Sequence, residues 1–273
     1  MTRVQSQTVK QVRSLFISDL HLGFRFSRAE ACLEFLRQYR VENLFLVGDF
    51  LDGWRLRRSW YWPPVYDQLI DHVLQQSAMG TLIRYTPGNH DEFLRGPRPE
   101  IPGVEFSDEF VHELVDGRRL LVTHGDLFDA VEKKFHRTSQ FGSQVYDGLA
   151  RCNFFTNRIL RRIGLGECNY CFAVKRLSKK ITGAVGHFDQ VLSDHARQQG
   201  CDAVICGHIH RPAIVENEDF AYLNTGDWVE HQSAIVEHVD GRMELVENGK
   251  CVKELSPRPA HAFNGSRTTA TVN

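Results

Sequence analysis

The sequence predicts an α/β domain, because short apolar runs alternate along it with segments of helical periodicity. Five of the apolar runs also lead into residues that commonly bind metals, at positions 19–21, 49, 89–91, 124–126 and 208–210. Ligands of α/β folds gather beyond the carboxyl ends of the strands, so we expect these five blocks to meet at one edge. The repetition of the pattern predicts a common site.

The first βα unit begins with a strand-like run at residues 15–17. It leads into Asp19 and His21, a carboxylate and an imidazole two positions apart. The segment that follows has the pattern of a capping box, in which Ser27 is expected to cap an amphipathic helix.

The second and third strands lead into blocks of the same kind. The run at residues 44–47 leads to Asp49, and the next helix is expected to begin after the proline pair that ends at Pro64. The run at 81–85 passes through a Pro-Gly turn into an Asn-His-Asp block at 89–91.

The segment between these two blocks, residues 54–62, mixes three Trp with three Arg. One interpretation is a wall that recognises substrate, with Trp54, Arg57 and Arg58 in contact with it. The other is a loop whose aromatic rings pack on the domain while its Arg side chains are solvated. Both interpretations stay open at this point.

The second half of the chain supplies further strands. Residues 111–114 and 119–122 flank an Asp-Gly turn and predict a hairpin, after which comes His124. A helix is expected over 184–199. The buried run that follows it ends in Gly-His-Ile-His, which presents His208 and His210 two positions apart. Short runs beyond residue 213 are expected to form antiparallel strands.

Residues 131–182 differ from the rest of the chain, because they contain no strand-like run and carry eleven basic but only three acidic side chains. Arg158, Arg161 and Arg162 lie among apolar residues at helical spacing, the pattern of a basic amphipathic helix. We expect a helical insertion that caps the site and contacts substrate through these three arginines. An ordinary solvated helix packed on the core has the same pattern.

The expected domain covers residues 12–255, including that insertion, and residues 256–273 are expected to form a disordered tail. A composition of 42% hydrophobic residues in a chain of 273 fits one domain with an elaboration. The net charge of −1 argues against nucleic acid as a general partner, so contact with an anionic surface requires a local patch. Seven scattered Cys residues and the lack of an apolar run of about 18 residues predict a cytoplasmic location.

The candidate metal ligands comprise two carboxylates, one amide and four imidazoles: Asp19, His21, Asp49, Asn89, His124, His208 and His210. Seven ligands suit two ions that share one carboxylate, an arrangement that activates water and neutralises phosphoryl oxygens. Nitrogen and oxygen donors without thiolate favour Mn²⁺, with Fe or catalytic Zn²⁺ as alternatives. Phosphoester hydrolysis is therefore the predicted chemistry.

The five blocks, in this order, resemble those of the calcineurin-like metallophosphoesterases. The resemblance implies a four-layer sandwich, with two mixed β-sheets flanked by helices. It also implies which residues bind each metal ion: Asp19, His21 and His210 one ion, Asn89, His124 and His208 the other, with Asp49 bridging. In the same family pattern, His90 would face the leaving oxygen and Asp91 would orient it.

Within that superfamily the chain resembles the UDP-2,3-diacylglucosamine pyrophosphatases of lipid A synthesis, through residues 50–54 and 206–212. This resemblance implies a nucleotide-linked glycolipid as substrate and peripheral contact with the inner membrane surface. Two features depart from that group, since His90 stands where those enzymes typically have Arg and residues 224–228 differ. The alternatives are a paralogue acting on a soluble phosphodiester, such as a cyclic nucleotide or nucleic acid, and a non-catalytic interaction module. The oligomeric state is open.

Overall fold

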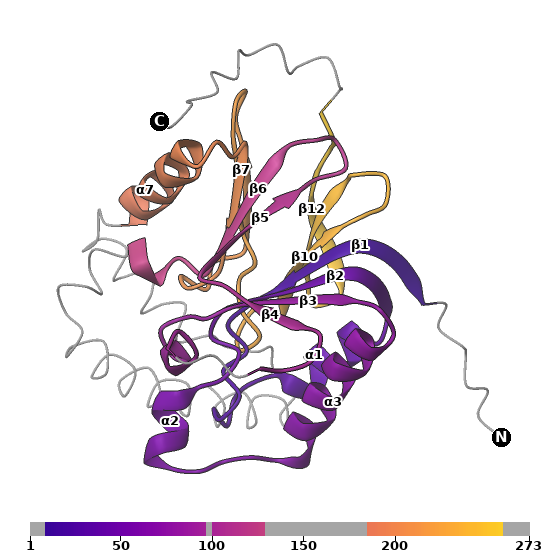
Figure 1. Ribbon diagram of the computed structural model, residues 1–273, viewed down its shortest axis with the longest axis vertical. Helices are drawn as coiled ribbons and strands as arrows, with labels where there is room; N and C mark the ends of the chain where they lie inside the picture. The colour runs from indigo at the N-terminus through magenta and orange to yellow at the C-terminus, as the bar shows by residue number, and fades with distance from the viewer. Residues whose placement is uncertain (1–8, 97–99, 129–184, 259–273) are drawn as a thin grey trace, which may run out of the picture.

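Two β-sheets pack face to face in the computed structural model, and helices cover their outer surfaces (Figure 1). The structure describes residues 9–96, 100–128 and 185–258 of the chain. The predicted α/β class, with two mixed sheets flanked by helices, is confirmed. The expected insertion at 131–182 lies outside the described residues, as does the tail beyond residue 258.

The larger sheet has seven strands in the order β12-β11-β10-β1-β2-β3-β4. Its parallel strands are β1 (Lys10–Ile17), β2 (Tyr39–Val47), β3 (Leu82–Thr86) and β4 (Val104–Phe106). Its antiparallel strands, which extend it beyond β1, are β10 (Ser233–Glu237), β11 (Met243–Glu247) and β12 (Lys250–Leu255).

The smaller sheet has five strands in the order β5-β6-β7-β9-β8. They are β5 (Glu109–Glu113), β6 (Arg119–Thr123), β7 (Ala203–Cys206), β8 (Ala213–Glu216) and β9 (Ala221–Asn224). The predicted hairpin is confirmed, because β5 and β6 pair antiparallel around a turn in which Gly117 has φ 82°. Antiparallel strands are expected beyond residue 213, and β8 pairs antiparallel with β9. The other edge of β9 differs from the expectation, because it pairs parallel with β7.

Helices lie on both outer faces of the two sheets. Those described are α1 (Ala29–Leu36), α2 (Gly53–Arg58), α3 (Pro64–Ala78) and α7 (Val185–Gln198), with single 3₁₀ turns at Glu92–Leu94 and Asp126–Phe128. The helix α3 begins at Pro64, one residue earlier than predicted, because the missing N–H of proline costs nothing in the first turn. The expected loop after Asp49 instead begins with α2.

The predicted capping role of Ser27 is wrong. The residue in the capping position before α1 is Arg28, and its side chain makes no capping hydrogen bond. The Ser27 hydroxyl donates a hydrogen bond to the carbonyl oxygen of Leu20, 2.6 Å away. It therefore fastens the start of α1 to the loop that carries Asp19 and His21.

The core is divided by the alternation of side chains along the central strands. Phe16 and Phe45, from β1 and β2, stack at 4.6 Å between ring centroids in the layer between the two sheets. Their neighbours Leu15 and Leu44 point to the opposite face and pack with buried residues of α1 and α3. Because both faces are covered, these strands are almost entirely apolar, which explains their clear signal in the sequence.

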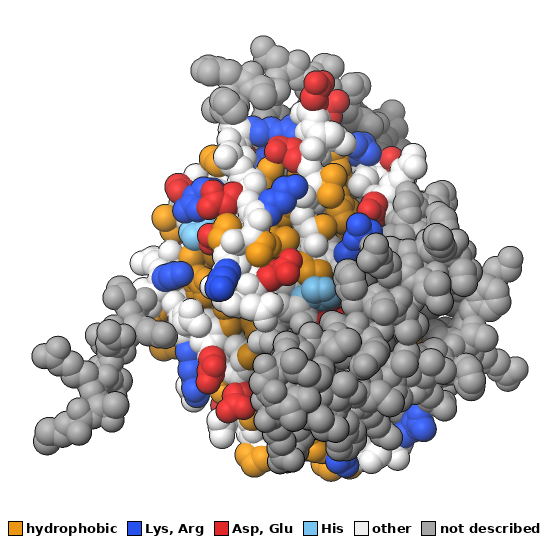
Figure 2. Space-filling view, turned by 180° about the vertical axis from the view of Figure 1, so that it is seen from behind, with side chains coloured by type: hydrophobic (Ala, Val, Ile, Leu, Met, Phe, Trp, Pro, Cys, Tyr) orange, Lys and Arg blue, Asp and Glu red, His pale blue; other side chains and the backbone are white. Residues whose placement is uncertain are grey.

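On the face shown in Figure 2, the described residues form no large patch of purely positive or purely negative charge. Basic and acidic side chains are interspersed there with apolar ones, in agreement with the net charge of −1.

Candidate metal centre

The loops at the carboxyl ends of both sheets are bonded to one another. The Asp19 amide donates to the carbonyl of Gly48 at 3.0 Å, which joins the β1 and β2 loops. The amide of Gly207 donates to the carbonyl of His124 at 3.2 Å, and that of Trp228 donates to the Asp19 carbonyl at 3.1 Å. These bonds bring loops of the two sheets to one edge, as the sequence predicts.

The backbone is left-handed at most of the candidate ligands. Of the described non-glycine residues, seven have positive φ, and five of them are candidate ligands, with φ between 49° and 65°: Asp19, His21, Asp49, His208 and His210. Such conformations cost of order 1 kcal/mol each outside glycine. Their concentration here shows that the loops are held in place by contacts elsewhere, and that the side chains are turned inward at this cost.

One cluster consists of Asp19, His21 and His210, whose ligand atoms lie within 4.8 Å of one another. The Nε2 atom of His210 is 3.0 Å from Asp19 Oδ1 and 3.4 Å from His21 Nε2. Asp19 is fully buried and His21 nearly so. A carboxylate and two imidazoles at these separations can bind a single divalent ion.

A second cluster overlaps the first and consists of Asp19, Asp49 and His124. The Oδ2 atom of Asp49 is 3.4 Å from His124 Nε2 and 3.9 Å from His21 Nε2, so this carboxylate lies between the two clusters. Burial raises the pKa of Asp49, but the imidazoles of His124 and His90 outweigh it and hold that pKa well below its ordinary value. Asp49 is therefore an anion that belongs to the second cluster and lies next to the first.

The orientation of His124 fits a cation at this position. Its Nδ1 atom is 2.9 Å from the carbonyl oxygen of Val47, which can only accept, so Nδ1 carries the proton. The Nε2 atom then faces the Asp49 carboxylate, and among the described residues it has no hydrogen-bond partner. Burial lowers the pKa of His124, but Asp49 raises it well above the ordinary value, because a positive charge is favoured between the two groups.

Glycine is required where the backbone passes closest to these side chains. A Cβ atom at Gly88 would overlap Asp49 and the ring of His124, and one at Gly207 would overlap Asp19. The glycines of the Gly-Asn-His-Asp and Gly-His-x-His blocks therefore make room for the two carboxylates.

The remaining two candidate ligands border the second cluster. The ring of His208 lies 5.3 Å from that of His124, centroid to centroid, and its amide donates to Asp19 Oδ2 at 3.0 Å. Asn89 is partly buried in the loop after β3, directly before His90, whose amide donates to Asp49 Oδ1 at 2.8 Å.

His90 contacts the first cluster from the side of α2. Its ring meets the His21 ring edge-on at 4.6 Å and lies 4.0 Å from the Trp54 ring. Its Nδ1 atom is 3.1 Å from Asp52 Oδ1. Burial lowers the pKa of His90, but the charges of Asp49 and Asp52 outweigh it and raise that pKa to about 9.

Asp91 has other partners than the one expected from the family pattern. Its carboxylate is fully buried and accepts hydrogen bonds from the backbone amides of Gly88 and Phe50 and from the hydroxyl of Tyr85. It thereby joins the β2 loop to the β3 loop. The carboxylate that lies beside the His90 ring is that of Asp52.

Sequence reasoning missed Asp52 as a member of the site. It is fully buried, lies 3.5 Å from Nδ1 of His21 and accepts from the backbone and side chain of Arg55. Burial raises the pKa of Asp52, but its hydrogen bonds to His21 and His90 lower it far more. The available signal was a second carboxylate three residues after Asp49, at the start of a helix.

Asp227 was missed as well. It is buried behind His210, with its Oδ2 atom 3.9 Å from His210 Nδ1 and 2.6 Å from His231 Nδ1. Burial raises its pKa, but the hydrogen bond to His231 and the charge of His210 lower it below the ordinary range. Asp227 follows the apolar strand β9, so the rule that found the other blocks also applies to it.

The expected substrate contacts lie in two places. Trp54 packs on His90, as described, while Arg57 and Arg58 are exposed on α2. Arg158, Arg161 and Arg162 lie outside the described residues.

Residues 12–212, most of the chain, match the family described as calcineurin-like phosphoesterase. The chain belongs to this family. Calcineurin-like phosphoesterases use a pair of divalent metal ions, and the two clusters, which overlap at Asp19, suit such a pair. This phosphoesterase is therefore a metal-dependent hydrolase of phosphoesters.

Two similar proteins from bacteria are named UDP-2,3-diacylglucosamine hydrolase. The one from Stenotrophomonas maltophilia (strain K279a) is 27% identical over 238 residues, covering 81% of this chain and 93% of the relative. The one from Aeromonas salmonicida (strain A449) is 25% identical over 258 residues, covering 91% and 97%. Among solved structures, Yfce, a phosphoesterase from E. coli, is 15% identical with a TM-score of 0.48, covering 90% of this chain and 99% of that one.

Within the part of this phosphoesterase that the structure describes, every helix is too short or too polar to cross a membrane.

Proposed function

We propose that this phosphoesterase cleaves the pyrophosphate bond of a nucleotide-linked glycolipid, with UDP-2,3-diacylglucosamine as substrate and UMP and 2,3-diacylglucosamine 1-phosphate as products. The observation that carries the proposal is the similarity to hydrolases named for this substrate over 81% to 91% of the chain. Because more than nine-tenths of each relative is covered, the likeness extends beyond the metal-binding blocks that any member of the family shares.

The proposed metal ligands are those that the family resemblance implies, and the two clusters support five of them: Asp19, His21, Asp49, His124 and His210. Asp19, His21 and His210 would hold one ion, and His124, His208 and Asn89 the other, with Asp49 shared. Mn²⁺ is the proposed metal, because the donors are nitrogen and oxygen only. When bound, the ions supply charge neutralisation at the phosphoryl oxygens and acidify water.

The proposed role of His90 is to donate a proton to the departing oxygen. Its Nδ1 atom lies beside Asp52, which holds the ring in place and stabilises the imidazolium, so Nε2 is the atom available to donate. Bound ions would share the negative charge of Asp49, and the contact with Asp52 would then be the main support for the protonated ring.

The test compares two substrates on one purified sample supplied with Mn²⁺. UDP-2,3-diacylglucosamine is expected to be hydrolysed with the higher kcat/KM, and bis-p-nitrophenyl phosphate serves as the small diester. Turnover of the small diester without turnover of the glycolipid would contradict the proposal.

A soluble phosphodiester, such as a cyclic nucleotide, is the second candidate substrate. The observation that favours it is His90, which stands where the lipid A group typically has Arg and which can protonate a leaving alkoxide. The same assay with a cyclic nucleotide decides between the two. The alternative of a non-catalytic interaction module is not carried forward, because the chain belongs to a family of hydrolases.

Contact with the cytoplasmic face of a membrane is proposed for the basic segment 131–182, on its sequence alone. Eleven basic side chains among apolar residues can meet both phosphate groups and acyl chains. Replacing Arg158, Arg161 and Arg162 by Gln should weaken binding to anionic vesicles and raise KM more for the acylated substrate than for the small diester. Equal losses on both substrates would indicate that the segment only supports the fold.

A further inference from the structure

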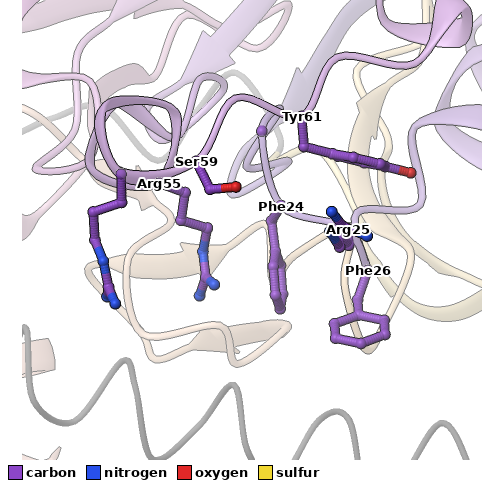
Figure 3. Close-up of a pocket in the computed structure, with 8 residues that line it drawn as sticks. Phe24, Arg25, Phe26, Arg55, Ser59 and Tyr61 are labelled. Carbon is purple, nitrogen blue, oxygen red and sulfur yellow. The ribbon is translucent and has the colours of Figure 1, made fainter.

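A pocket of about 200 Å³ lies beside the metal centre, between the loop that follows His21 and the helix α2 (Figure 3). Three aromatic rings and three arginines supply most of its lining: Phe24, Phe26, Tyr61, Arg25, Arg55 and Arg58. Neither the expected metal ligands nor His90 belong to it. It is therefore a separate feature of the site.

The pocket is cationic. None of the described residues that line it carries a carboxylate, whereas three carry a guanidinium group. Arg55 shares its charge with Asp52, 2.8 Å away, but Arg25 and Arg58 are exposed. Guanidinium groups bind phosphate with paired, charge-assisted hydrogen bonds, so an anionic phosphate group is the ligand that this lining favours.

The arginines are held in position by the rings. The guanidinium carbon of Arg55 lies 3.8 Å from the centroid of the Phe24 ring, and that of Arg25 lies 4.9 Å from the centroid of Tyr61. Figure 3 shows Arg55 and Phe24 side by side and extending in the same direction. Contact with the Tyr61 ring restricts the position of the Arg25 guanidinium group, and the aromatic walls suit a flat ring.

The pocket is connected to the metal centre through one carboxylate. Asp52 Oδ2 accepts from Arg55 Nε at 2.8 Å and lies 3.5 Å from Nδ1 of His21. On the other side, Gly23 of the pocket comes two residues after His21 in the chain. The pocket therefore lies next to the metal centre, on the side of His21 and Asp52.

We propose that this pocket binds the nucleoside monophosphate part of the substrate, an inference that rests on the function proposed above. The ligand class follows from the lining: a phosphate for the arginines, and a flat ring for the aromatic walls. The volume of about 200 Å³ is below the ~300–1,000 Å³ typical of pockets for drug-sized ligands, so it suits one ring system and excludes two acyl chains.

The test is calorimetric titration of UMP into the full chain after removal of metal by a chelator, so that phosphate cannot bind to ions. UMP is expected to bind, and to bind more tightly than inorganic phosphate or uridine. The double variant Arg25→Ala, Arg58→Ala should raise the Kd for UMP about tenfold or more, because two charge-assisted contacts are lost. The matched control is Arg40→Ala, which removes an exposed arginine from β2 and should leave the Kd within about twofold.

Two results would overturn the inference: an unchanged Kd for UMP in the double variant, or equal affinity for UMP and inorganic phosphate in the unaltered chain. Hydrolysis of bis-p-nitrophenyl phosphate with Mn²⁺, assayed on the same preparation, reports on the phosphoesterase activity independently. Binding of UMP without turnover of UDP-2,3-diacylglucosamine would contradict the proposed function and leave the pocket assignment standing. Turnover of UDP-2,3-diacylglucosamine without binding of UMP would support the proposed function and contradict the pocket assignment.

Discussion

At the scale of single residues, the site depends on Asp49, the carboxylate between the two clusters. Asp49→Ala should abolish hydrolysis and reduce the binding of both metal ions, because it removes the ligand that we propose both ions share. Metal analysis of the purified variant by mass spectrometry, together with diester hydrolysis, checks this. The outcome that would sink the assignment is a variant that still holds two ions at full occupancy.

A substitution at His90 tests proton transfer separately from metal binding, because His90 is not one of the proposed metal ligands. His90→Asn should lower kcat about 10²- to 10⁴-fold, as expected for the loss of a general acid, while metal content changes little. A substrate with a poor leaving group should show the larger loss, since it depends most on protonation. Near-normal kcat on such a substrate would instead make His90 a structural residue of the β3 loop.

At the scale of elements, a buried polar group of side chains from both sheets joins the two sheets. Glu237 of β10 accepts from the Ser14 hydroxyl of β1 at 2.6 Å and lies 2.8 Å from Nε2 of His112 of β5. Arg13 completes the group as an ion pair with the same carboxylate. Since β1 and β10 belong to one sheet and β5 to the other, this group fixes how the sheets align.

Removing the charge of Glu237 should therefore destabilise the fold. Glu237→Gln is expected to lower the free energy of unfolding by about 1–3 kcal/mol, because buried partners lose charged hydrogen bonds. Urea unfolding at neutral pH measures the loss. The control is Glu254→Gln on β12, where the carboxylate is half exposed, with an expected change within about 0.5 kcal/mol.

The pKa of Glu237 also leads to a prediction of how the stability of the fold changes with pH. Burial raises the pKa of Glu237, but the bond to His112 outweighs it, and Ser14 and Arg13 lower it further, so the folded pKa lies below the ordinary value of 4.5. Because the pKa is lower in the folded chain than in the unfolded chain, the ionised carboxylate stabilises the fold at pH values above the unfolded pKa of about 4.5. This stabilisation is lost as the pH falls from about 4.5 toward the folded pKa. In Glu237→Gln, the free energy of unfolding should fall less steeply as the pH is lowered below about 4.5. An equally steep fall in the variant would mean that other groups cause the loss of stability.

At the scale of the whole molecule, the two sheets bring six loops to one edge and bury several carboxylates there. Asp19, Asp49, Asp52 and Asp91 are all almost fully buried, so the folded chain gathers negative charge that bound cations would neutralise. Mn²⁺ should therefore raise the Tm as well as the activity. Saturation at 100 times Kd corresponds to about 2.7 kcal/mol.

Thermal unfolding with chelator and then with added Mn²⁺ measures this linkage. Mg²⁺ at the same concentration is the comparison, since it prefers oxygen ligands and should stabilise a site rich in imidazole less. An identical Tm with chelator and with Mn²⁺ would contradict binding of ions at these clusters.

Much of the fold and site could be predicted from the sequence, because the informative signals are local. The strands through Ile17, Val47 and Cys206 are buried on both faces and therefore continuously apolar, and each leads directly into its ligand block. The proline pair that marks the start of α3 is a local signal of the same kind. The partners of Ser27 could not be predicted, because its hydroxyl bonds to the preceding loop instead of to its own helix.

The sequence by itself determined the α/β class, the strand order along the chain and the seven candidate ligands, since each depends on neighbouring residues. Only the tertiary structure decided which side chains support them: Asp52 beside His90, Asp91 across the β2 and β3 loops, and Asp227 behind His210. It also decided that Arg25 and Arg58 border one pocket, although they lie 33 positions apart in the chain. The physical reason is that these contacts join loops from different strands, and the packing of the two sheets sets the distances between those loops.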